Sequence, residues 1–76
     1  MIELFHATND AGASAAARRF VTEHALEDKL RFRNVHYPEV LADLHARGGK
    51  LTPALWDGTR LVEGEAAVLE ALRALI

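Results

Sequence analysis

The stretch KLTPALWDG, residues 50–58, carries a proline at the start of a short apolar run that leads into an Asp-Gly turn. Proline has no backbone N–H, so within sheets it is confined to edges, first residues and bulges. Pro53 therefore excludes a continuous ladder through this position. It indicates that a strand begins here beside an unpaired backbone site.

The absence of cysteine removes a whole class of chemistry from the chain. Disulfides, thiolate metal sites and thiol redox reactions by its own side chains are excluded. The 76 residues suffice for one small core, so we expect a single domain over residues 1–76. Half of the residues are apolar and 26% are charged, which is typical of a globular chain.

The charge and the hydropathy pattern limit the partners. A net charge of −2, without a strong basic cluster, disfavours a nucleic-acid binder. The opening residues MIELFHATND lack a charged leader with a long apolar core, and no run approaches the ~18 apolar residues of a membrane span. We therefore expect a cytoplasmic protein that binds neither nucleic acid nor membrane.

Hydrophobic periodicity predicts the element order β-α-β-α-β-β-α. The expected strands cover residues 2–7, 30–36, 51–56 and 59–62, and the expected helices follow Asn9 or Asp10, begin near Pro38 and begin after Gly64. The alternation of residues 30–33 indicates an edge strand. A strand-helix-strand opening favours parallel pairing, and Asp57-Gly58 favours a type I′ hairpin, so the sheet should be mixed and four-stranded.

That element order, together with Thr52-Pro53 opening the third strand, resembles the thioredoxin fold, and within it the glutaredoxins and the N-terminal domain of glutathione transferases. The segments IELF, LTPALWDGTRLVEG and EAAVLEAL are similar in order and spacing to the first strand, the proline-hairpin-glycine segment and the last helix of those families. The resemblance implies an α/β fold of thioredoxin-like, glutaredoxin type with helices on both faces. It also implies a cis Thr52–Pro53 bond.

The chain departs from that family at the redox motif. Counting back from ARRFV places Ala11-Gly12-Ala13-Ser14 where glutaredoxins carry Cys-x-x-Cys or Cys-x-x-Ser. The resemblance therefore implies a cysteine-less, non-redox member that binds a peptide, a protein or a glutathione-like ligand in the groove beside the proline. No catalytic residue is assigned. The expected ligand contacts are Thr52, Pro53, Glu63, Gly64, Ala11 and Ser14.

Glutathione binding, or a subunit or enzyme of glutathione transferase type, is the alternative. Ser14 could then activate the thiol of bound glutathione, although a serine in a first helical turn is more often a simple polar residue. A helix N-terminus could receive the ligand carboxylate, but Glu63 and Glu65 already place negative charge there. Lys50 and Arg47 could hold the other end of the ligand.

Two further groups of residues leave alternatives open. His6 and His36 end neighbouring strands near Asp10, where open α/β sheets bind ligands, but their spacing is unlike that of a zinc site and no metal is assigned. Trp56 is either a binding anchor or a core residue beneath the hairpin. The apolar last helix, which ends at Ile76, suggests a dimerisation domain as a third possibility, so we expect a monomer or a weak homodimer.

Overall fold

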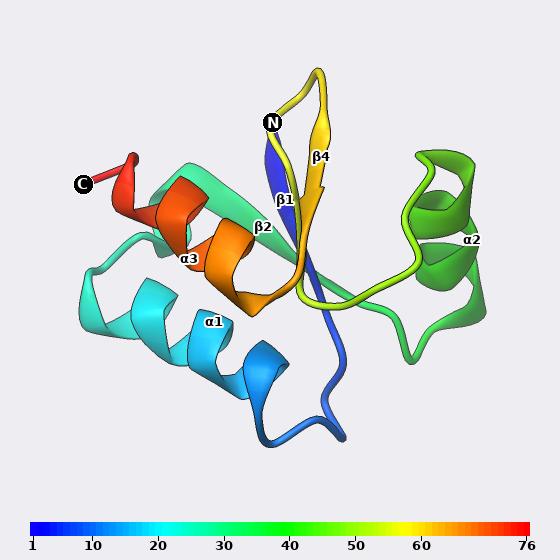
Figure 1. The fold of residues 1–76 in the computed structure, drawn as a ribbon, viewed down its shortest axis with the longest axis horizontal. Helices are drawn as coiled ribbons and strands as arrows, with labels where there is room; N and C mark the ends of the chain where they lie inside the picture. The colour runs from blue at the N-terminus through cyan, green and yellow to red at the C-terminus, as the bar shows by residue number, and fades with distance from the viewer.

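The computed structural model describes residues 1–76 as one mixed sheet of four strands with three α-helices (Figure 1). The elements in chain order are β1 (Ile2–His6), α1 (Ala13–Glu23), a short 3-10 helix (Glu27–Lys29), β2 (Leu30–Asn34), α2 (Pro38–Ala46), β3 (Ala54–Trp56), β4 (Leu61–Glu63) and α3 (Glu65–Arg73). The strand order is β2-β1-β3-β4. This mixed α/β arrangement is compatible with a thioredoxin-like fold.

Strand β1 is one of the two inner strands of the sheet. It pairs in parallel with β2, from Ile2 opposite Leu30, and antiparallel with β3, from Phe5 opposite Ala54. Strand β4 then pairs antiparallel with β3. Strand β2 therefore lies at an edge, as its alternating pattern predicted, and the sheet is mixed as expected.

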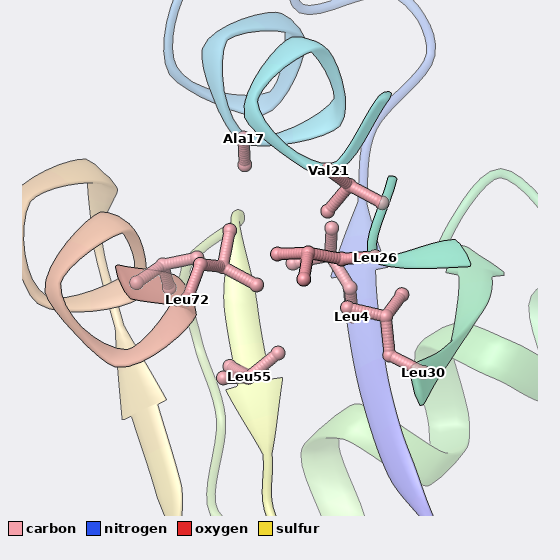
Figure 2. Packing of buried hydrophobic residues seen from close by; sticks show 8 residues of the cluster. Leu4, Ala17, Val21, Leu26, Leu30, Leu55 and Leu72 are labelled. Carbon is pink, nitrogen blue, oxygen red and sulfur yellow. The ribbon is translucent and has the colours of Figure 1, made fainter. Parts of the chain in front are cut away.

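Helices α1 and α3 cover one face of the sheet with an apolar layer. Figure 2 shows Ala17 and Val21 of α1 and Leu72 of α3 pointing toward Leu4 and Leu55 on the strands. Removal of so much apolar surface from water is the main stabilising contribution to a domain of this size. The buried members of this cluster are Leu4, Ala17, Val21, Leu26, Leu30, Leu55, Val68 and Leu72.

Helix α2 covers the other face with fewer apolar contacts (Figure 1). Only four buried apolar residues form this cluster, namely Phe5, Val40, Leu44 and Ala54. Trp56 packs against them, with the guanidinium of Arg47 4.9 Å from the centre of its ring. Trp56 is thus a half-buried core residue of the α2 face.

Charged side chains fill the rest of the α2 face. Glu3 is only 8% exposed, and its carboxylate accepts hydrogen bonds from Arg33 and, at 2.7 Å, from Nη1 of Arg47. Arg33 also donates from Nη2 to Asp43 of α2 at 2.6 Å. A carboxylate this deeply buried requires such partners, because an unpaired charge in a low-dielectric interior is strongly destabilising.

The hairpin between β3 and β4 differs from its prediction. A type I′ turn at Asp57-Gly58 needs positive φ at both residues, but Ala25 is the only non-glycine residue with positive φ. The loop instead spans residues 57–60, with Asp57 N–H donating to the Arg60 carbonyl. The Asp57 carboxylate accepts the N–H groups of Thr59 and Arg60 at 2.8 Å each. The type I′ prediction is wrong because these side-chain bonds stabilise a wider loop.

Two apolar residues in or next to the helices are exposed. Leu41 of α2 is 38% exposed, and Ile76, after the end of α3, is 69% exposed. On α3 only Val68 and Leu72 are fully buried, whereas Leu69 is half-buried and the helix ends at Arg73. The buried stripe is therefore narrower and shorter than the sequence pattern.

Candidate functional site

Thr52 and Pro53 lie immediately before β3, and the peptide bond between them is cis. Pro53 is buried, whereas Thr52 is half-buried. Neither the N–H nor the C=O of Thr52 has a hydrogen-bond partner within the chain. Most backbone groups in folded proteins are paired, so this residue offers both a donor and an acceptor to an external partner.

The residue that would continue the β1–β3 ladder toward Thr52 is Ala7. Phe5 pairs with Ala54, so the antiparallel register would bring Ala7 opposite Thr52. The backbone groups of Ala7 are instead bonded elsewhere: its N–H donates to the Ser14 hydroxyl at 3.1 Å, and its C=O accepts from Asp10 N–H and from Arg18. The ladder therefore stops two residues short of Thr52.

Glu63 fixes the chain on the other side of Thr52. Its Oε1 accepts the N–H groups of Lys50 and Leu51 at 2.6 and 2.8 Å. These bonds, the Lys50 bond first, lower the pKa of Glu63, with help from the nearby Lys50 charge. The Gly64 N–H donates to the Pro53 carbonyl at 2.9 Å. Four of the predicted contact residues, Thr52, Pro53, Glu63 and Gly64, are thus joined in one locally fixed unit.

Asp10 caps the start of α1. Its Oδ2 accepts the Ser14 N–H at 3.0 Å and its Oδ1 accepts the Gly12 N–H at 2.8 Å, and these two bonds lower its pKa. An aspartate that accepts N–H groups in the first turn is a usual way to satisfy a helix N-terminus. Two of the N–H donors at the position of the missing redox motif, those of Gly12 and Ser14, are therefore bonded to a carboxylate of the chain itself.

The other two predicted contacts, Ala11 and Ser14, differ in their accessibility. Ala11 is exposed and faces no partner that the structure records. Ser14 is completely buried, and its hydroxyl accepts the Ala7 N–H. In this structure Ser14 therefore connects α1 to the end of β1, and its hydroxyl is not presented to a ligand. Whether any of the six residues contacts a ligand stays a prediction.

The predicted histidine cluster is replaced by a pairing that the sequence did not reveal. His6 is 6% exposed, and its Nδ1 lies 3.2 Å from Nη1 of Arg18. Burial, followed by the Arg18 charge, lowers the pKa of His6. His36 is exposed, and no group of three metal-ligating side chains occurs in the structure. The spacing of His6 and Arg18 across two elements gave no local signal, because it depends on how α1 docks on β1.

The surface near Thr52 is open. The two surface hollows both lie along α3, and neither is lined by Thr52 or Pro53. The larger, of about 540 Å³, begins at the first turn of α3, one residue after Gly64, and is lined by Glu65, Ala66, Leu69, Glu70 and Arg73. An enclosed small-molecule pocket is therefore not present beside Thr52, whereas an extended chain could reach both its backbone and this hollow.

Comparison of the chain with protein-family models, curated proteins and solved structures gave no match. None of its helices combines the length and the apolar character that crossing a membrane requires.

Proposed function

We propose that this chain is a non-redox binding module of thioredoxin-like, glutaredoxin type, which receives an extended peptide segment of a protein partner beside Thr52–Pro53. The observation that carries the proposal is the unpaired N–H and C=O of Thr52, held between two hydrogen-bonded neighbours. An extended peptide can supply both missing bonds by adding as one short strand. Affinity then comes from main-chain bonds and specificity from adjacent side chains.

The neighbouring residues support a peptide as the ligand. Leu51 is 59% exposed next to Thr52 and offers an apolar contact for one peptide side chain. The Glu63 bonds to Lys50 and Leu51 hold this segment in place before binding, which reduces the ordering that a ligand must bring about. Thiol exchange is no part of the function, since the chain contains no cysteine.

The test is a titration of ¹⁵N-labelled protein with a short blocked peptide of β-forming residues, followed by amide chemical shifts. We expect the Thr52 amide to shift most, together with Leu51 and Gly64. The same peptide with its backbone N-methylated at alternate residues should lose this effect, because it cannot form the strand bonds. Equal binding of the methylated peptide, or shifts confined to other surfaces, would refute docking at Thr52.

A matched pair of variants tests the side-chain contribution. Leu51→Ser should weaken peptide binding roughly three- to tenfold, because it removes part of one apolar contact. Leu41→Ser is the control, since Leu41 is also an exposed leucine but lies on α2. Equal loss in both variants would mean that the peptide does not bind beside Leu51.

A further inference from the structure

The charges around Thr52 restrict which peptide can bind there. Carboxylate ligands are commonly held at helix N-termini, where free N–H groups and the helix dipole favour negative charge. Helix α3 begins close to the Thr52 segment, as the bond of Gly64 to Pro53 shows, and α1 begins beside Ala7, the residue that the β1–β3 register would bring opposite Thr52. Whether the N–H groups of these two helix starts are already bonded, and which charges surround them, therefore decides between acidic and basic ligands.

Both helix starts carry negative charge that disfavours an anion, although only the donors of α1 are bonded to a carboxylate. At α1 the Asp10 carboxylate already accepts the Ser14 and Gly12 N–H groups. At α3 the residues on either side of Gly64 are Glu63 and Glu65. Glu63 is ionised near neutral pH, as glutamates ordinarily are, and the bonded N–H groups of Lys50 and Leu51 lower its pKa further. A ligand carboxylate would meet three negative charges here.

The nearby cations do not reverse this preference. Arg18 donates to His6 and to the Ala7 carbonyl, which are uncharged partners, so its positive charge remains and acts on Asp10. The Lys50 charge also lowers the pKa of Glu63, less than the backbone N–H groups do, so these two opposite charges partly offset each other. Glu65 is exposed and has neither a hydrogen-bond partner nor an ion pair in the structure. Asp10, Glu63 and Glu65 together outnumber Arg18 and Lys50 by one charge, so the net charge beside the site is negative.

The hollow along α3 continues this acidic surface away from Gly64. Its polar lining consists of Glu65 and Glu70, with Arg73 at the far end of the helix. The Arg73 guanidinium lies 6.0 Å from the centre of the Phe20 ring on α1. Ala66 and Leu69 supply an apolar floor along which the stem of a long basic side chain can pack.

From these features we propose that the partner is an extended peptide segment bearing lysine or arginine, with its backbone on Thr52 and a basic side chain in the hollow beside Glu65 and Glu70. This inference rests on the proposed function, because it assumes docking at Thr52. It disfavours glutathione, which carries two carboxylates and one ammonium group. Opposite charge across such a surface contributes mainly to specificity and to the rate of association.

The experiment compares three probes by the amide shifts of Thr52, Leu51 and Gly64. They are a blocked peptide of alternating lysine and valine, the same peptide with glutamate replacing lysine, and glutathione. We expect the lysine peptide to bind most tightly, and its affinity to fall as salt is added. Glu65→Gln should weaken it about two- to fivefold.

Glu39→Gln is the matched control, since Glu39 is an exposed glutamate in the first turn of α2, on the other face of the sheet. It should leave the affinity for the lysine peptide unchanged. Equal or tighter binding of the glutamate peptide or glutathione at Thr52 would overturn the charge preference while leaving the docking site intact. If no probe shifts the Thr52 amide, the proposed function is refuted together with this inference.

Discussion

The α1–α3 face and the α2 face of the same sheet bury their side chains by different means. Eight apolar residues fill the first, whereas four apolar residues and the Glu3 ion network fill the second. Apolar burial is nearly independent of pH and salt, but an ion network depends on the protonation of its carboxylates. The first face therefore supplies most of the stability, and the second makes the attachment of α2 sensitive to conditions.

The largest effect should come from the apolar face. Leu72→Ala should lower the free energy of unfolding by about 2–5 kcal/mol, because it leaves a cavity in a layer that is packed on all sides. Leu72 is completely buried between α3 and the sheet (Figure 2). Urea denaturation followed by circular dichroism measures this change.

Leu44→Ala on the α2 face is the matched comparison, since Leu44 is buried to the same degree. It should cost about 2 kcal/mol, at the low end of that range, because α2 can move inward over the smaller cluster. A loss as large as that of Leu72→Ala would show that both faces are packed equally tightly.

Removal of the Glu3 charge should have the next largest effect. Glu3→Gln leaves Arg33 and Arg47 without their shared carboxylate and should lower the free energy of unfolding by about 1.5–3 kcal/mol at pH 7. Amide hydrogen exchange should rise more in α2 than in α1 and α3, because the network holds α2 to the sheet. Uniformly faster exchange in all three helices would contradict this local role.

The same carboxylate predicts an acid-sensitive window. Burial alone would raise the pKa of Glu3, but the hydrogen bonds and charges of Arg47 and Arg33 outweigh it and lower the pKa below 4.5. A carboxyl whose pKa is lowered in the folded state contributes its full stability above the pKa of the unfolded chain. This stability is lost as pH falls through the lower pKa of the folded state. In Glu3→Gln the loss of stability below pH 4.5 should be correspondingly smaller.

The smallest effect on the free energy of unfolding should come from His6, which lies on the α1–α3 face. Burial and Arg18 lower its pKa below 6.5, so as pH falls from about 6.5 the unfolded chain binds a proton that the folded chain excludes. Stability should therefore begin to fall below pH 6.5, before Glu3 titrates. His6→Gln should remove this early decline in urea denaturation series. An unchanged decline would assign it to another group.

Hydrophobic periodicity was enough to predict the sequence of elements and the edge position of β2. These features depend on patterns within a single segment, such as the alternation in residues 30–33 or the apolar stripe of α3. Boundaries were less accurate: β3 begins at Ala54 rather than at residue 51, because Glu63 binds the N–H groups of Lys50 and Leu51. A side-chain bond between distant segments has no local signature.

The ion network was missed for the same reason, whereas Asp10 at the start of α1 was predicted as one of two candidate caps. Glu3 within IELFH carried one available signal, since a charge inside a buried strand requires partners. Its partners come from β2 and from the end of α2, and only the folded register identifies them. At the candidate site the sequence indicated an unpaired backbone near Pro53. That Ala7 is bonded to Ser14, and so leaves Thr52 free, required the structure.

The central position of β1 bears on how quickly the chain can fold. Strand β1 is the first strand of the chain, but both of its partners are distant in sequence. They begin at Leu30 in β2 and at Ala54 in β3. Contacts between such distant segments require large loops to close before any pairing energy is gained, which slows folding relative to helical domains of the same size. In nascent chains that have not yet reached β3, one edge of β1 has unpaired N–H and C=O groups, to which a strand of another chain can add.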